Sequence, residues 1–178
     1  LRTRAADIGD TLLKVSESHF IRSQKSYDSG DLERAYDEAI EAWELMLLIE
    51  SVNPYQATTQ LALAKIALTQ VERGDESFAI QAKDRYLQLA IDFRGYPTLV
   101  GTAATAMASL GEYNEAIRLA NRAIGTESTT KPWAKAWYAK GISEYFLGDV
   151  SLGLKSLITS TNKEPGSSTS KLAHKALS

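Results

Sequence analysis

Glycine–acid pairs and prolines alternate along this chain, and this order constrains the fold more than any other feature. In chain order they are Gly30-Asp31, Pro54, Gly74-Asp75, Pro97, Gly111-Glu112, Pro132, Gly148-Asp149 and Pro165. A glycine supplies the left-handed residue that ends one helix, and the acid after it can cap the next helix. A proline cannot continue a helix but can open one. The order predicts a series of helical hairpins, with a positive φ at the turn glycine Gly148.

The segments between these turn residues have the apolar spacing of helices. Within 113–125, apolar residues recur three and four positions apart. No stretch shows sustained alternation with a period of two, so we predict no strands. The predicted helices span 11–28, 32–52, 56–72, 76–92, 98–109, 113–125, 133–146 and 150–162, with a last one near 168–177. The sequence thus predicts an all-α fold.

Successive turn glycines are 44, 37 and 37 residues apart, which indicates an internal repeat. In each unit, small residues stand where two packed helices would cross, and larger ones fill the gap beside them. The last unit has Trp137, Gly141, Gly153, Leu157, Ser160 and Pro165. The unit before it has Val100, Ala104, Ala116, Ala120 and Ala123, and the first unit has Ser23, Ala35, Ala39 and Ala42. The second has Leu63 and Ala67, and an insertion of three residues after Gly74 would bring Ala82, Tyr86 and Leu89 into the same frame.

This frame resembles the tetratricopeptide repeat, a helical hairpin of about 34 residues. Lys140, Glu144 and His19 depart from the residues that are usual at their positions. The resemblance implies an α-solenoid of about four tetratricopeptide-like helical hairpins with a C-terminal capping helix. We therefore predict a single domain over 1–178. Its repeats lie near 11–52, 56–92, 98–125 and 133–162, and the cap lies near 168–177.

The resemblance also implies a binding surface, because the first helices of such repeats line a concave groove. Carried over to this sequence, the partner-binding residues are Phe20, Gln24, Tyr27, Lys65, Leu68, Thr102, Thr105, Tyr138, Ile142 and Tyr145. Aromatic side chains in that groove would anchor an extended or helical peptide. Packing between repeats is the alternative role for Phe20, Leu68 and Ile142.

Some members of this family grip the C-terminal carboxylate of a chaperone with lysine and asparagine side chains. The matching residues here are Phe20, Gln24, Lys65, Thr98 and Thr102. Only one of them is a lysine, and it stands where the family has an asparagine. We therefore expect no carboxylate clamp of this kind.

The residues that carry enzyme chemistry do not occur in recognisable patterns. The chain has no cysteine, and His19 and His174 stand in different repeats without a partner at ligand spacing. No nucleophile, base and orienting group occur together. For the acids of one helix we expect a solvated outer face: Asp31, Glu33, Asp37, Glu38, Glu41 and Glu44. We predict no catalytic residue, metal site or cofactor. The favoured function is a non-enzymatic adaptor, assembly factor or scaffold, and a small-ligand-binding protein or enzyme is the less favoured alternative.

Charge and hydropathy argue against nucleic-acid and membrane binding. The net charge is −2 and the pI is about 5.8. Trp137 lies near Lys135 and Lys140, but it holds a packing position of the repeat, so we predict no nucleic-acid partner. No apolar run approaches the roughly 18–20 residues that span a bilayer, so we expect no direct membrane insertion. Because the chain begins at Leu1, we expect a trimmed fragment, and the sequence assigns no compartment.

Five consecutive apolar residues, 45–49, bear on self-association. One face of a helix cannot hold five successive positions, which advance by about 100° each. The favoured interpretation is that the first helix covers them with Leu12, Leu13 and Val15, and the alternative is an exposed patch. Residues 31–50 carry a net charge of −6 and residues 131–178 one of +4, which suits either head-to-tail contacts or an oppositely patterned partner. We expect a protein or peptide partner, with a homo-oligomeric, self-assembling architectural subunit as the alternative.

Overall fold

The computed structural model describes residues 2–49, 54–125 and 134–178. They form two compact units, Leu1–Arg85 (unit 1) and Tyr86–Ser178 (unit 2). Over these ranges the chain is helical and contains no strand, so the predicted all-α class is confirmed. The single domain predicted over 1–178 stays a prediction.

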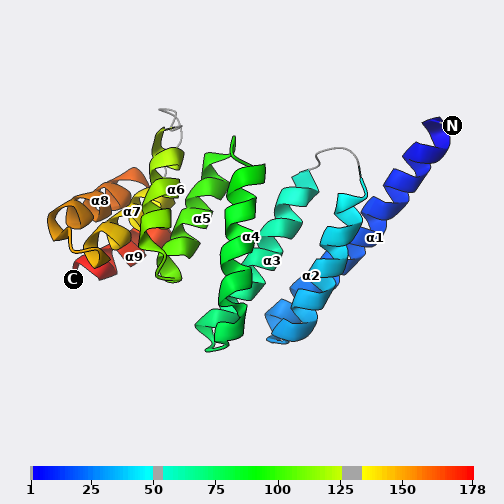
Figure 1. Cartoon of the computed structure of the whole chain (residues 1–178), viewed down its shortest axis with the longest axis horizontal. Coiled ribbons are helices and arrows are strands. Elements are labelled where there is room, and N and C mark those ends of the chain that lie inside the picture. Colours follow the sequence, from blue (N-terminus) through cyan, green and yellow to red (C-terminus); the bar gives the residue numbers. More distant parts are fainter. Residues whose placement is uncertain (1, 50–53, 126–133) are drawn as a thin grey trace. The chain divides into compact units, whose positions relative to one another are not determined.

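Unit 1 begins with a long helical hairpin, which is followed by a third helix and a short 3-10 helix (Figure 1). Its elements are α1 (Arg2–Ser29), α2 (Leu32–Leu47), α3 (Pro54–Glu72), the short 3-10 helix η1 (Glu76–Phe78) and the first part of α4 (Ala79–Asp92). A core cluster of Ala35, Ala39, Leu63 and Ile66 joins α2 to α3. Because two of these residues are alanines, the two helices pack closely.

Unit 2 holds the end of α4, two further hairpins and a terminal helix (Figure 1). The hairpins are α5 (Pro97–Ser109) with α6 (Tyr113–Gly125) and α7 (Ala134–Phe146) with α8 (Val150–Lys163). The last helix, α9 (Ser168–Leu177), packs against α7 and α8, where Thr169, Ser170 and Ala173 are buried. This contact is the one expected of the predicted C-terminal cap.

The four Gly–acid turns share one backbone geometry. The φ angle is +86° at Gly30, +98° at Gly74, +77° at Gly111 and +95° at Gly148. At each turn the amide of the acid donates to a carbonyl five residues back, at 2.9 or 3.0 Å. This bond is the Schellman ending of a helix, which needs a left-handed residue before it. The predicted hairpin turns and the positive φ at Gly148 are confirmed.

Three of the four acids also cap the helix that follows. The side chain of Asp31 accepts a hydrogen bond from the Arg34 amide, and that of Asp149 accepts one from the Leu152 amide. Asp75 caps η1 in the same way. Each aspartate therefore satisfies an amide that the helix itself leaves without a partner.

The predicted boundaries differ from the structure mainly at three places. α1 begins at Arg2 rather than at 11, since no proline interrupts 2–10. α2 ends at Leu47 rather than at 52, because the Leu48 amide bonds to Leu45, a tightened last turn. The helix predicted over 76–92 is divided into η1 and α4. The predicted helix end at 50–52, the linker 126–132 and residue 133 lie outside the described residues.

The short helix η1 accounts for the irregular second repeat. It occupies three residues after the Gly74 turn, as the predicted insertion requires. Ala82, Tyr86 and Leu89 are buried, whereas Ala79 and Lys83 are only partly buried. The frame shifted by three residues is therefore confirmed.

Helices α7 and α8 cross at a pair of glycines. A Cβ atom on Gly141 would lie 2.8 Å from the Leu157 amide nitrogen, and one on Gly153 would lie 2.8 Å from the Gly141 carbonyl oxygen. Side-chain carbons do not approach backbone this closely, so glycine is required for the two backbones to touch. The small-residue positions of the repeat thus lie at the helix crossing, as predicted.

The favoured interpretation of the apolar run 45–49 is wrong in part. Met46 is buried and Leu45 is half-buried, but Leu47 and Leu48 are 60% and 65% exposed. Val15, which was expected to cover them, is itself exposed. The helix buries one face against its neighbours, and consecutive positions cannot all lie on that face. The run therefore leaves an exposed patch.

Candidate functional site

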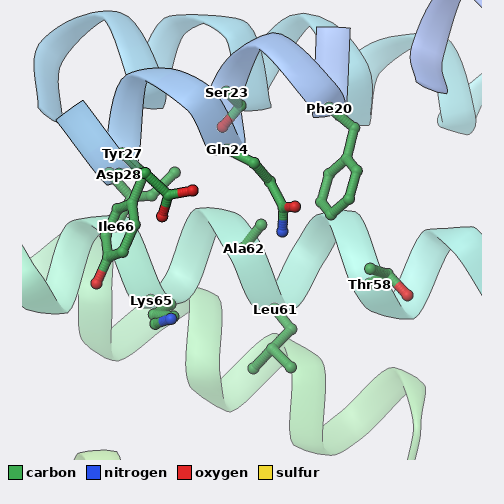
Figure 2. Close-up of a pocket in the computed structure, with 10 residues that line it drawn as sticks. All are labelled: Phe20, Ser23, Gln24, Tyr27, Asp28, Thr58, Leu61, Ala62, Lys65 and Ile66. Carbon is green, nitrogen blue, oxygen red and sulfur yellow. The ribbon is translucent and has the colours of Figure 1, made fainter. Parts of the chain in front are cut away.

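A groove between α1 and α3 is the candidate site of unit 1 (Figure 2). It holds a cavity of about 260 Å³. The lining residues from α1 are Phe20, Ser23, Gln24, Tyr27 and Asp28, and those from α3 are Thr58, Leu61, Ala62, Lys65 and Ile66. Four of the predicted partner-binding residues, Phe20, Gln24, Tyr27 and Lys65, thus meet in one cavity.

Hydrogen bonds and packing hold the Tyr27 side of this groove. The Tyr27 hydroxyl lies 3.0 Å from Thr69 Oγ1, and Thr69 Oγ1 lies 2.9 Å from the Lys65 carbonyl oxygen. The Lys65 ammonium stands 4.8 Å from the centre of the Tyr27 ring, within the range of a cation–π contact. Tyr27 also packs on the core cluster through its ring. It is therefore a fixed wall of the groove rather than a free anchor.

The polar residues at the mouth are more accessible. Gln24, Asp28 and Lys65 are exposed, and Figure 2 shows the Gln24 side chain reaching toward α3 between the two helices. An amide of this kind can both donate to and accept from a peptide backbone. The predicted residue Leu68 is half-buried and is not among the lining residues.

Sequence reasoning missed Asp28, Thr58 and Leu61. Thr58 and Leu61 precede Lys65 by seven and four residues, so they share its face of α3. Asp28 follows Gln24 by four residues on α1. Extending the predicted positions by one helical turn would have found Asp28 and Leu61, and a second turn along α3 would have found Thr58.

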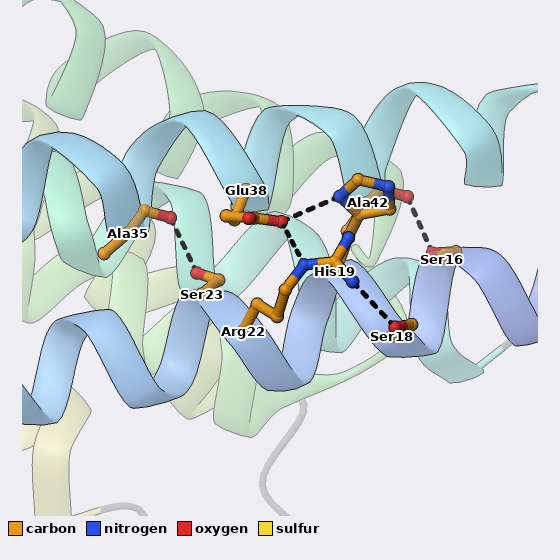
Figure 3. Close-up of polar contacts among 8 residues, drawn as sticks. All are labelled: Ser16, Ser18, His19, Arg22, Ser23, Ala35, Glu38 and Ala42. Carbon is orange, nitrogen blue, oxygen red and sulfur yellow. Dashed lines mark hydrogen bonds and ion pairs between the residues drawn. The ribbon is translucent and has the colours of Figure 1, made fainter.

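The side of α1 that faces α2 carries a polar cluster (Figure 3). Arg22 Nε donates to Glu38 Oε2 at 2.9 Å, and His19 Nδ1 lies 2.8 Å from the same oxygen. The bond from Arg22 is the main cause that holds the pKa of the Glu38 carboxyl below its ordinary value; partial burial opposes it, and His19 adds to it. The solvated outer face predicted for this helix is therefore wrong at Glu38, which points to α1. The other five acids are exposed.

In unit 2 the predicted residues Thr102 and Thr105 lie beside α7. Thr102 lines a cavity of about 200 Å³ between α5 and α7, together with Thr98, Gly101 and Lys135. Thr105 Oγ1 donates to the Gly101 carbonyl at 3.0 Å, and the Lys135 ammonium lies 3.5 Å from Thr102 Oγ1. These polar groups are largely occupied by contacts within the chain.

The remaining predicted residues, Tyr138, Ile142 and Tyr145, follow one face of α7. Tyr138 and Ile142 are half-buried, and burial raises the pKa of the Tyr138 hydroxyl. Tyr145 is exposed and its ring meets Phe146 edge-on. The three are not among the residues that line either cavity described above.

Two further expectations concern metals and membranes. Over the described residues, no group of three or more histidine, aspartate or glutamate side chains is placed to hold a metal ion. Among the described helices, none has the length and apolar character to cross a membrane.

The fold defined by these hairpins is that of tetratricopeptide-repeat proteins. No family model and no curated protein sequence matches the chain. The chain is similar to the solved structure of MamA protein, with a TM-score of 0.64 and 16% identity over 92% of this chain and 83% of that one. It is also similar to a tetratricopeptide repeat protein from Parabacteroides merdae, with a TM-score of 0.65 and 20% identity. That match covers 92% of this chain and 59% of the other. The resemblance inferred from the sequence is thus confirmed for the fold.

Proposed function

We propose that the α1–α3 groove binds a segment of a partner protein, and that the chain is a non-enzymatic interaction module of the adaptor, assembly-factor or scaffold kind. The cavity that brings Phe20, Gln24 and Tyr27 opposite Leu61 and Lys65 carries this proposal. It combines an apolar wall with exposed polar groups at its mouth. That combination suits a peptide, whose side chains alternate with backbone amides.

The size of the cavity favours a peptide over a cofactor. At about 260 Å³ it lies below the roughly 300–1,000 Å³ of most sites for small molecules. One or two side chains of a peptide would fill it, and the backbone would continue along the groove. Gln24 is the residue expected to bond to that backbone.

The charges at the mouth indicate what the peptide carries. Lys65 stands on α3 and Asp28 on α1, so the groove presents a cation and an anion on opposite sides. A segment with an apolar residue flanked by polar or charged ones would match this arrangement. In unit 2, the face of α7 with Tyr138 and Tyr145 is proposed as a second partner contact.

Site-specific crosslinking tests the proposal. A photo-reactive phenylalanine analogue is placed at Gln24 and, as the control, at Gln81, an exposed glutamine of α4 that does not line the groove. Crosslinking in cells should capture a partner from the first position and not from the second. Equal capture from both positions, or capture from Gln81 alone, would contradict a groove site.

A peptide copied from the captured segment then gives the energetics. Gln24→Ala should raise its Kd by about tenfold, the loss expected for one or two backbone hydrogen bonds. Tyr138→Ala and Tyr145→Ala, measured with the intact partner, test the second surface. If they leave binding unchanged, the partner contacts α1 and α3 alone.

A further inference from the structure

Helix α8 carries an exposed apolar row. Val150, Leu154 and Ile158 are four residues apart and are 47%, 37% and 51% exposed, and Leu147 continues the row into the turn. We name these four residues the α8 row. Single exposed apolar side chains are ordinary, but three on one face of a helix, with a fourth in the turn before it, indicate a docking surface.

The equivalent residues of the preceding repeat are covered by the next hairpin. Tyr113 and Ile117 of α6 stand 37 residues before Val150 and Leu154 and hold the same repeat positions. Both are half-buried, and the Tyr113 ring stacks on Phe146 of the next hairpin, 5.2 Å between centres. The α8 row is therefore a surface on which a further hairpin can stack.

Unit 1 has the same arrangement. Tyr36 and Ile40 of α2 are the equivalents of Leu154 and Ile158. They pack against the core cluster that α3 completes, and Tyr36 meets Phe78 of η1 edge-on at 5.4 Å. By contrast, α9 does not cover the α8 row, and its own Leu172 is 50% exposed.

Lysines outnumber acids on the last two helices. Lys155 is exposed on α8 beside Ile158, and Lys171 and Lys175 are exposed on α9. Lys163 is half-buried at the end of α8. Asp149 and Glu164 are the acids at the two ends of α8. Residues 149–178 thus carry four lysines and two acids, which favours an acidic partner surface.

An acidic surface with exposed leucines lies on α2. Asp37, Glu41, Glu44 and Leu48 are exposed and spaced four, three and four residues apart, so they share one face. Leu47, also exposed, adjoins it. We name these five residues the α2 face. The α2 face offers carboxylates to the lysines of α8 and α9, and leucines to the α8 row.

We propose that the α2 face of one copy of this chain docks on the α8 row of a second copy. The pairing of like surfaces is disfavoured, because two α8 rows would bring their lysines together and two α2 faces their carboxylates. A contact between unlike surfaces is heterologous, so each pair leaves one α2 face and one α8 row free. The copies can therefore add further copies or close into a ring.

Sedimentation velocity of the whole chain tests this contact. We expect the average mass to rise from about 10 μM to about 500 μM at low salt and to fall again in about 0.5 M salt, which screens the charges. Leu48→Lys and Ile158→Glu should each weaken association by about tenfold or more, since each places a repelling charge in the contact. Ile80→Glu, at a 73% exposed position outside both surfaces, is the matched control and should change nothing.

Mixing the two variants decides the geometry. Leu48→Lys keeps an intact α8 row and Ile158→Glu keeps an intact α2 face, so an equimolar mixture should associate although neither variant does alone. Loss of association in Ile158→Glu only would instead show a contact between two α8 rows and overturn the proposal. A monomeric wild-type chain at every concentration and salt, with unchanged melting curves in all variants, would overturn it as well.

Discussion

The first hairpin, α1–α2, and the last, α7–α8, have the same turn but different crossings. Gly30 and Gly148 both hold a positive φ and end their helices with the same hydrogen bond. At the crossing, the last hairpin has two glycines in backbone contact, whereas the first has Ser23, whose Oγ donates to the Ala35 carbonyl at 2.7 Å. The repeat therefore fixes where the helices meet, and the side chains at that point fix how closely.

The two hairpins also differ in which helix carries the acid that lies between their helices. In the first hairpin an acid of the second helix, Glu38, bonds to Arg22 of the first. In the last hairpin the acid stands on the first helix: Glu144 Oε2 accepts from Ser156 Oγ at 2.7 Å, and Ser156 is the equivalent of Glu38. Lys140, the equivalent of Arg22, lies 3.7 Å from Glu144. One acid between the helices is thus common to both, although its position is not.

The largest effect is expected where the crossing is tightest. Gly153→Ala gives the last hairpin the residue that the first carries at Ala35, but its Cβ would meet backbone at 2.8 Å. The clash should exceed the gain of about 1 kcal/mol in helix propensity and destabilise the chain by about 2 kcal/mol. Chemical denaturation measures this. An unchanged or raised free energy of unfolding would show that the crossing can widen at no cost.

The shared turn should respond alike in both hairpins. Gly148→Val forces a β-branched residue into the left-handed region at φ +95°, at a cost of about 1–2 kcal/mol. Gly30→Val should cost a similar amount at φ +86°. Thermal melts of both variants test the symmetry. A loss in one variant only would mean that the two turns are not equivalent.

A smaller loss of stability should be equal in the two hairpins, because the same serine-to-carbonyl hydrogen bond joins their helices. In the first hairpin the serine stands on the first helix, and in the last hairpin it stands on the second. Ser16 Oγ of α1 donates to the Ala42 carbonyl at 2.8 Å, and Ser160 Oγ of α8 donates to the Ala134 carbonyl at 2.8 Å. Ser16→Ala and Ser160→Ala should each cost about 1 kcal/mol. Urea unfolding gives both free energies. Losses that differ by more than about 1 kcal/mol would show that the two hydrogen bonds do not contribute equally.

The smallest effect is pH-dependent and belongs to the first hairpin. The pKa of Glu38 is lowered in the folded chain, chiefly by Arg22, so its contribution to stability is present above the carboxyl's ordinary pKa of 4.5 and is lost as the pH falls through the lowered value. Glu38→Gln should therefore lower the free energy of unfolding at pH 7 by at most about 1 kcal/mol, since the pair is partly exposed. The difference from wild type should shrink toward pH 3. A constant difference would rule out the ionised carboxylate as its cause.

Much of the fold could be predicted because single residues decide it locally. The turn glycines, the aspartate caps and the insertion at η1 all follow from short-range backbone chemistry. The exposure of Leu47 and Leu48 did not follow, because it depends on which neighbours reach the end of α2. The prediction that Glu38 is solvated was wrong for a similar reason. The carboxylate turns toward α1 because Arg22 lies across the hairpin from it, and the sequence alone does not show that placement.

The candidate site was predicted in part. Phe20, Gln24, Tyr27 and Lys65 came from repeat positions and meet in one cavity. The role of Tyr27 as a fixed wall depends on Thr69 and the core cluster, contacts across two helices that periodicity cannot show. The two faces proposed for self-association required the exposed fractions of individual side chains.

The most direct test of the central claim is hydrogen–deuterium exchange of the whole chain with and without the peptide captured at Gln24. A partner in the α1–α3 groove should slow exchange in 17–28 and 58–66 and leave 33–44 and 150–158 unchanged. Protection confined to 33–44 or 150–158, with none in α1 and α3, would contradict the groove as the binding site.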